Sequence, residues 1–377
     1  MTVGIDATNI KSGGGLTHLI ELINHLIIED HAIDKIIVFG GKSLDQLPVK
    51  DWLLKKKYKE LDEHFMIASY WKVVKFTQEL KKNKVDILFN PGGVYVGSFR
   101  PVVTMSQNML VYEKKERDRY RWSHNWIRLL ALNILQSYTA KRSDGIIFIS
   151  NYASSYIKRL IPNLKYTAMI YHGISDRFRC QPKKQYPIQN YCQTNRYVLT
   201  YTSTIEQYKH QDKLILAISE LNKLGYSIQL KLIGVIGSSR MKKKMEPLLK
   251  LYSGFVDYLG LVPFEEIHEY YLNTDGFIFA STCENMPNIV IEAMSAGLPI
   301  ISSNFGPMPE VLKDAALYFD PTDIVSIKKT IVEFLENVEK RKLIANKAYE
   351  YSKSFSWQLC SHETFMFLSK VFSENKK

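Results

Sequence analysis

Two carboxylates, Glu284 and Glu292, stand at a point where a buried strand gives way to a helix. An apolar run ends at Ala280, a polar turn follows, and Pro287 suits the first turn of a helix because its missing N–H costs nothing there. The amino end of a helix attracts anions, so a diphosphate could bind at this turn. The two carboxylates could then accept hydrogen bonds from sugar and ribose hydroxyls. The residues alone fit equally well a capping role for Glu284 and a solvated helix position for Glu292.

A second candidate for phosphate chemistry is the glycine loop Gly13–Gly15, which follows the first apolar strand and opens a helix. Glycines let the backbone approach a ligand closely. A dinucleotide-binding fingerprint would need a third glycine where His18 stands and an acidic residue at the end of the second strand, which reads Phe39-Gly40-Gly41. We therefore expect no NAD site, and favour a loop whose amides contact a phosphate or an acceptor. His18 could face that ligand or be a structural histidine.

Alternating strands and helices must position these residues. Short apolar runs alternate with helical patterns through both halves, which indicates parallel sheets covered on both faces. The runs predict strands at Val3–Asp6, Lys35–Phe39, Phe65–Ile67, Ile87–Phe89, Val102–Met105, Gly145–Ile149, Tyr197–Tyr201, Gln229–Ile233, Phe255–Leu259, Gly276–Ala280, Pro299–Ser302 and Leu317–Phe319.

A chain of 377 residues is too long for a single compact core, so two doubly wound α/β domains are expected. The polar stretch 182–195 has the composition of a linker. We predict a first domain at 1–181, a second at 196–356, and a last helix at about 357–377 that returns to the first domain.

Charge and cysteine usage limit the partners and the compartment. The net charge of +12 favours an anionic partner, yet no zinc-finger or RNA-recognition spacing is present, which disfavours nucleic acid. The four cysteines are scattered, as in a reducing compartment, and no apolar run reaches the length of a membrane span. The basic, aromatic segment Lys114–Arg142 and the cluster Lys55–Lys57 suit either a membrane surface or an ordinary solvated face. We expect a cytoplasmic protein, peripheral on the inner face of the membrane.

The spacing from Glu284 to Glu292 resembles the E-x7-E motif of retaining glycosyltransferase family 4, the glycosyltransferase group 1 enzymes with the GT-B fold. The runs Glu292–Pro299 and Gly306–Val311 are similar to that family's second-domain signature, and the motif resembles bacterial enzymes of O-antigen and surface-polysaccharide synthesis. The resemblance is stronger after about residue 255. It implies two Rossmann-like doubly wound domains that face each other across a cleft.

The resemblance also implies roles for single residues. Glu284 would hold hydroxyls of the transferred sugar, Glu292 the ribose of the nucleotide, and Lys209 would neutralise the leaving diphosphate. The remaining donor-site positions that match the family's motifs are Gly14, Gly15, Val262, Asn285, Met286, Pro287 and Asn288.

Two departures from the family pattern bear on this assignment. Ser203 stands where the family commonly has an arginine, six residues before the lysine, so leaving-group stabilisation would rest on Lys209, helix amides or another base such as Arg240. Near Asn108 many members have a histidine that contacts the donor sugar. Here an amide would make that hydrogen bond, with His18 as a further sugar or acceptor contact.

The reaction implied is transfer, with retention, from a nucleotide diphosphate sugar to a hydroxyl of a lipid-linked or growing surface glycan. No metal or other cofactor is expected, and no carboxylate is placed as a nucleophile, so front-face substitution is the expected mechanism. Three alternatives stay open: a sugar-nucleotide epimerase, a non-catalytic nucleotide-sugar-binding protein, and a nucleic-acid-binding protein. The sequence does not predict which sugar, nucleotide or acceptor is used.

Overall fold

The computed structural model describes residues 1–376, which form two compact units. The first unit contains Met1–Gly173 together with the C-terminal segment that begins at Ser356. The second unit contains Ile174–Phe355. The chain therefore passes from one unit to the other twice, so that the second unit is an insertion in the sequence of the first.

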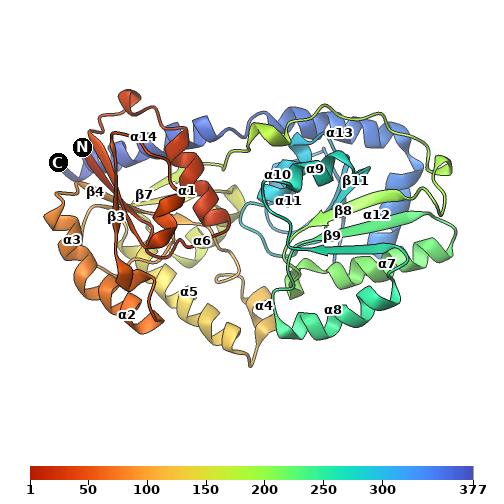
Figure 1. The fold of residues 1–377 in the computed structure, drawn as a ribbon, viewed down its shortest axis with the longest axis horizontal. Coiled ribbons are helices and arrows are strands. Elements are labelled where there is room, and N and C mark those ends of the chain that lie inside the picture. The colour runs from red at the N-terminus through yellow and green to blue at the C-terminus, as the bar shows by residue number, and fades with distance from the viewer. Residues whose placement is uncertain (377) are drawn as a thin grey trace. The chain divides into compact units, whose positions relative to one another are not determined.

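The first unit is built on a seven-stranded parallel sheet with the strand order β3-β2-β1-β4-β5-β6-β7 (Figure 1). Its central strands are buried apolar runs, as expected for a parallel sheet with helices on both faces, whereas the edge strands β3 and β7 are partly exposed. They are β1 (Thr2–Asp6), β2 (Lys35–Gly40), β3 (Leu53–Lys57), β4 (Ile87–Asn90), β5 (Val102–Ser106), β6 (Gly145–Phe148) and β7 (Tyr166–Met169).

Eight helical segments of four residues or more, beside short 3₁₀ turns, surround this sheet within the described residues. They are α1 (Gly14–Asn24), α2 (Phe65–Tyr70), the π-helical η4 (Trp71–Lys75), α3 (Phe76–Lys82), α4 (Lys114–Arg117), α5 (His124–Arg142), α6 (Asn151–Leu160) and α14 (Trp357–Lys376). The last helix packs on α1, β4 and β6. Gly145 permits this approach, because a Cβ there would lie 2.9 Å from a methyl group of Val371.

The second unit repeats the plan with a six-stranded parallel sheet in the order β10-β9-β8-β11-β12-β13 (Figure 1). Its strands are β8 (Tyr197–Thr202), β9 (Ile228–Ile233), β10 (Val256–Gly260), β11 (Gly276–Phe279), β12 (Ile300–Ser303) and β13 (Leu317–Phe319). Its helices are α7 (Gln211–Lys223), α8 (Ser239–Leu251), α9 (Ile267–Leu272), α10 (Asn288–Ser295), α11 (Met308–Leu312), α12 (Ile324–Glu336) and α13 (Val338–Ser352). Two Rossmann-like parallel sheets are therefore confirmed.

The boundary between the units lies earlier than the predicted one at residue 181. The Cys180 N–H donates to the Ser295 carbonyl at 2.9 Å, and a Cβ on Gly297 would lie 2.6 Å from Pro182 N, so this segment is packed closely against α10. The stretch 182–195 also belongs to the second unit: the buried Arg341 donates to the Tyr186 carbonyl. The polar composition of this stretch predicts a linker, but its Tyr186 carbonyl is bound by the buried guanidinium of Arg341.

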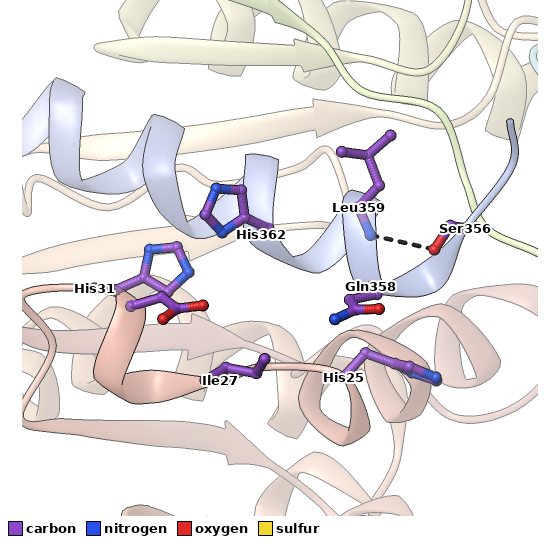
Figure 2. A pocket seen from close by; sticks show the side chains of 8 residues that line it. His25, Ile27, His31, Ser356, Gln358, Leu359 and His362 are labelled. Atoms are coloured by element: carbon purple, nitrogen blue, oxygen red, sulfur yellow. Dashed lines mark hydrogen bonds between the residues drawn. The ribbon is translucent and has the colours of Figure 1, made fainter.

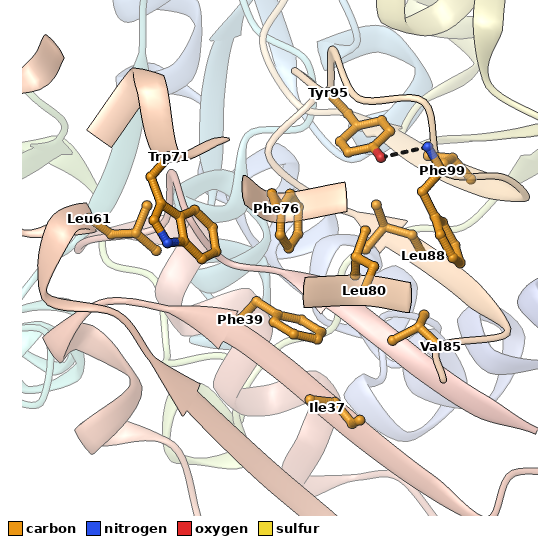
Figure 3. Packing of buried hydrophobic residues seen from close by; sticks show 11 residues of the cluster. Ile37, Phe39, Leu61, Trp71, Phe76, Leu80, Val85, Leu88, Tyr95 and Phe99 are labelled. Atoms are coloured by element: carbon orange, nitrogen blue, oxygen red, sulfur yellow. Dashed lines mark hydrogen bonds between the residues drawn. The ribbon is translucent and has the colours of Figure 1, made fainter. Parts of the chain in front are cut away.

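The prediction of a strand at Phe65–Ile67 is wrong, because these residues begin α2. The Met66 N–H donates to His64 Nδ1 at 3.5 Å, and the helix continues through η4 into α3. Trp71 and Phe76 point into a buried cluster with Phe39 (Figure 3). Phe65 and Met66, in contrast, are exposed. A run of three apolar residues is too short to show whether hydrophobic residues recur with the period of a strand or of a helix.

Candidate functional site

The site centres on the place where the strand order of the second sheet reverses. The strands β8 and β11 are neighbours in the order β10-β9-β8-β11-β12. The chain continues from β8 to β9 on one side of this pair and from β11 to β12 on the other side. Open α/β sheets bind ligands beyond the carboxyl ends of strands at such a point. Lys209 ends the short helix η8 (Gln207–Lys209) after β8, and Glu284 lies in the loop between β11 and α10.

Lys209 and Glu284, 75 residues apart in sequence, form an ion pair at this edge, in which Lys209 Nζ donates to Glu284 Oε1. Lys209 is buried, and its ammonium lies 5.3 Å from the ring centroids of both Tyr208 and Phe279, so that aromatic faces contribute to holding the charge. The Tyr201 hydroxyl donates to the Lys209 carbonyl at 3.0 Å. The structure thus brings together the two residues that the sequence predicts to be catalytic.

Backbone hydrogen bonds fix the two loops that carry this pair. The Thr282 N–H donates to the Tyr208 carbonyl at 2.8 Å, and Thr282 Oγ1 lies 3.3 Å from His210 Nε2. The loop after β12 lies alongside, since a Cβ on Gly306 would be 3.8 Å from the backbone N and O of Glu284. The ion pair is therefore held by main-chain geometry on both sides.

Glu292, predicted as a ribose ligand, is a buried residue of α10 with 4% of its surface exposed. Its Oε2 accepts a hydrogen bond of 3.1 Å from the Tyr271 hydroxyl. Burial raises the pKa of Glu292 to about 7, against the lowering influence of Tyr271 and of the Arg177 guanidinium. Sequence reasoning did not find Tyr271, because it lies on α9, at a spacing from Glu292 that no motif marks.

Two of the four residues from Asn285 to Asn288 do not offer a backbone N–H to a ligand. Pro287 has no N–H, and the Asn288 N–H donates to the Met286 carbonyl at 3.1 Å. Asn285 and Met286 are buried, on the chain between Glu284 and the helix. A diphosphate at this turn would therefore meet a narrower set of amides than the helix start alone suggests.

The other predicted donor-side positions lie in loops that follow strands of the same sheet. Ser203 follows β8, its hydroxyl donates to the Thr204 carbonyl at 3.0 Å, and its N–H donates to the Ile233 carbonyl. Val262 is half-buried after β10. Arg240, the other base considered for the leaving group, lies in the first turn of α8, where it is exposed.

Of the predicted site residues in the first unit, some lie on the surface and one lies in the interior. Gly14 and Gly15 begin α1, and a Cβ on Gly14 would meet no atom within 4 Å, so the loop faces open space. Asn108 is exposed after β5. His18 is buried, with its ring 4.6 Å from that of His172, and burial holds its pKa well below the ordinary value. This interior place does not fit the predicted contact with a sugar.

A separate pocket of about 310 Å³ lies where α14 runs beside the end of α1, and Figure 2 shows the side chains that line it. The rings of His31 and His362 are 5.1 Å apart there, and burial lowers the pKa of His31. Among residues 1–376, however, no group of three or more histidine, cysteine or acidic side chains is arranged to hold a metal ion. Metal-independent chemistry stays a prediction.

Known proteins are similar to the part of the chain that carries this geometry. Residues 183–351 match the family model for glycosyl transferases group 1. Over 111 residues the chain is 34% identical to an O-antigen chain mannosyltransferase B of Escherichia coli, covering 29% of this chain and 29% of that protein. The first curated relatives are matched over between 25% and 61% of their own length.

Solved structures match over nearly the whole chain. A sucrose-phosphate synthase from Thermosynechococcus elongatus superposes with a TM-score of 0.75 at 15% identity, covering 99% of this chain and 100% of that one. An Anabaena protein, HepE, in complex with UDP and glucose, gives 0.69 at 17% identity, covering 98% and 100%. At such identities the likeness concerns the fold alone. Residues 183–351 therefore carry the sequence pattern of glycosyl transferases group 1, and the described chain has the two Rossmann-like parallel-sheet units of the GT-B fold.

Proposed function

We propose that this protein is a retaining glycosyltransferase of family 4 that moves a sugar from a nucleotide diphosphate sugar to the hydroxyl of a lipid-linked or growing surface glycan. The buried pair of Lys209 and Glu284 at the switch point of the second sheet carries this proposal. Similarity to an O-antigen mannosyltransferase, and to the fold of a protein solved with UDP and glucose, supports the acceptor class and the donor class.

In the proposed reaction each member of the pair acts on a different part of the donor. Lys209 places its ammonium against the leaving diphosphate, where a preorganised cation stabilises charge that develops in the transition state. Glu284 accepts hydrogen bonds from hydroxyls of the transferred sugar and orients its anomeric carbon. The acceptor hydroxyl forms a bond to the anomeric carbon on the face from which the diphosphate leaves, and its proton passes to the departing phosphate oxygen, so the anomeric configuration is retained.

Glu292 completes the donor site in this proposal by binding the ribose. Its carboxylate is held by Tyr271, so ribose hydroxyls would meet an acceptor whose position is already fixed. No metal is included, since cationic side chains supply the positive charge in the proposed scheme.

The donor prediction can be tested by thermal unfolding with UDP-, GDP-, ADP- and dTDP-sugars. One nucleotide class is expected to raise the melting temperature, since a ligand at 100 times its Kd adds about 2.7 kcal/mol to the free energy of unfolding. Lys209→Met should remove the shift. The control Lys353→Met, which breaks the exposed pair with Glu350 on α13, should keep it.

Three outcomes would contradict the proposal. Conversion of the donor without an acceptor would indicate an epimerase, and donor binding without transfer to any hydroxyl acceptor would indicate a binding protein. Salt-sensitive binding of oligonucleotides with no shift by any nucleotide sugar would indicate a nucleic-acid-binding protein.

We also propose that the first unit docks on the anionic inner face of a membrane. Among residues 1–376 no helix is both long and apolar enough to span a bilayer. The outer side of α2 and η4 nevertheless exposes six large apolar side chains in ten residues, with Phe65 at 79% and Met66 at 72% exposure. Patches of this kind mark interaction sites. Lys72 and Lys75 lie on the same helical segment, and Arg128 lines a cavity together with Phe65 and Val73.

Sedimentation with vesicles tests this docking. Binding to vesicles that contain phosphatidylglycerol should exceed binding to neutral vesicles and should fall with salt, since each surface cation contributes about 1 kcal/mol. Val74→Glu should weaken it, whereas the control Val49→Glu, at a 90% exposed position outside the patch, should not. Equal binding by the two variants would contradict this surface.

A further inference from the structure

The first unit contains a cavity of about 790 Å³, which is lined by residues of that unit and includes Asn108, the position predicted to contact a sugar. It lies at the switch point of the first sheet, where β1 and β4 are neighbours in the order β3-β2-β1-β4-β5. Asp6 and Asn9 line it at the end of β1, and Gly92 lines it just after β4. The geometry of the second sheet is thus repeated, with a different set of side chains.

The base of this cavity is polar and buried. Asp6 is 4% exposed, and its Oδ1 accepts hydrogen bonds from the N–H and the hydroxyl of Thr8 at 3.0 and 2.6 Å. Both bonds use the same oxygen, so Oδ2 can accept from a hydroxyl in the cavity. Such an acceptor suits a sugar better than an apolar group, because an unpaired buried carboxylate is costly.

A second polar group lies directly behind the wall at Gly92. Asn90 is fully buried, and within residues 1–376 neither its Oδ1 nor its Nδ2 has a hydrogen-bond partner. A Cβ on Gly92 would be 3.5 Å from Asn90 Oδ1 and 3.6 Å from Asn9 Cβ, so this amide lies within van der Waals distance of the cavity wall. Buried amides without partners are rare and call for a ligand or a water.

The side walls carry cations and apolar groups. Lys72, which donates to Asn9 Oδ1, and Arg128 both line the cavity, and Arg128 forms no ion pair with any described residue. Phe65 and Val73 line it from α2 and η4, and Leu135 from α5. All three are also exposed, so the apolar wall continues onto the outer surface. The buried Trp71 and Phe76 anchor this helical segment to the core beneath (Figure 3).

We propose that this cavity binds a lipid phosphate sugar, with sugar hydroxyls at Asp6, the phosphate between Lys72 and Arg128, and the hydrocarbon chain along Phe65, Val73 and Leu135. The polar base, the two cations and the apolar wall follow one another from the interior to the surface, which is the order of groups in such a molecule. This rests on the proposed function, for which the lipid phosphate sugar would be the acceptor.

Three probes separate the parts of this ligand by isothermal titration calorimetry below their micelle concentrations. The full probe is glucose joined through a phosphodiester to a dodecyl chain. The second is dodecyl glucoside, which lacks the phosphate, and the third is methyl glucosyl phosphate, which lacks the chain. The full probe is expected to bind about tenfold or more tightly than either of the others, since a charge-assisted hydrogen bond or several buried methylene groups is lost in each.

Matched variants test the assignment of each wall. Lys72→Met should weaken the full probe about tenfold or more, and should leave dodecyl glucoside nearly unchanged. Lys75→Met, one turn further along η4 and outside the cavity, is its control. Val73→Glu should weaken both dodecyl probes, whereas Val74→Glu, which does not line the cavity, should affect vesicle binding only. Asp6→Asn should reduce the preference for the full probe over dodecyl phosphate.

The outcomes distinguish this inference from the proposed function. If Lys72→Met and Val73→Glu bind the full probe like the unaltered protein while nucleotide sugars still stabilise the fold, the cavity assignment is wrong and the donor proposal stands. If the full probe binds as expected but no nucleotide sugar does, the transferase proposal is wrong and the cavity is a lipid phosphate sugar site of another protein class. Transfer to glucose as efficient as transfer to the full probe would also overturn the assignment.

Discussion

Single replacements at Lys209 or Glu284 are expected to abolish sugar transfer and to destabilise the fold, whereas the double replacement regains stability without activity. Lys209→Met leaves Glu284 as an uncompensated, largely buried carboxylate, and Glu284→Gln leaves the Lys209 ammonium without its carboxylate. Removing one partner of a buried pair costs about 3–5 kcal/mol, while replacing both with neutral side chains is often close to neutral. Loss of one preorganised electrostatic contact lowers kcat about 100- to 1000-fold.

Chemical unfolding of the four proteins in this cycle, together with transfer assays, gives the coupling energy and the activities. Lys353→Met is the control, because it breaks another lysine–carboxylate pair of the second unit, with Glu350, in which both side chains are exposed, and it should cost less than about 1 kcal/mol. Full transfer activity in either single variant would remove that residue from the mechanism. Additive destabilisation in the double variant would show that the two charges do not interact.

The stability of the second unit is expected to fall as pH rises from about 5 to 8, because of Glu292. Its pKa is raised from 4.5 to about 7 by burial, so the folded protein holds a proton that the unfolded chain has released. Stability is therefore lost between the unfolded and the folded pKa as pH increases. A difference of this size corresponds to about 3 kcal/mol above pH 7.

Glu292→Gln should abolish this slope and be the more stable protein at pH 8, while it binds the nucleotide more weakly. Urea unfolding at intervals from pH 5 to 8, with and without nucleotide, measures both effects. Glu246→Gln on the exposed face of α8 serves as the control and should keep the slope. An unchanged pH profile in Glu292→Gln would assign the proton to another group.

The buried strands could be predicted because their apolar runs are short and are bounded by polar turns, and eleven of the predicted runs agree with observed strands within one residue at each end. The edge strand β3 was not predicted, because Leu53–Lys57 reads as a polar cluster. Phe65–Ile67 was assigned to a strand because the exposed side of α2 is as apolar as an interior strand. A surface that is apolar for binding cannot be told from a core by composition alone.

The site shows the same division between local and distant information. The turn at Pro287 and the helix that follows it could be predicted, since caps and breakers act on adjacent residues. That Tyr271 binds Glu292 depends on how α9 packs beside α10, which no spacing encodes. Burial of His18 against His172 and Trp357 likewise depends on α14 returning to the first unit.

The return of α14 also sets an order for folding during synthesis. Because Trp357–Lys376 packs on α1 and on the central strands, the first unit lacks one of its covering helices until this segment has left the ribosome. The inserted unit is complete about twenty residues earlier, by Phe355. While it is being made, Val371's partners on β6 and the Leu22 carbonyl that binds Ser361 stay uncovered. We therefore expect the inserted unit to fold before the first unit is complete. Until then the first unit exposes an apolar surface that a chaperone could bind.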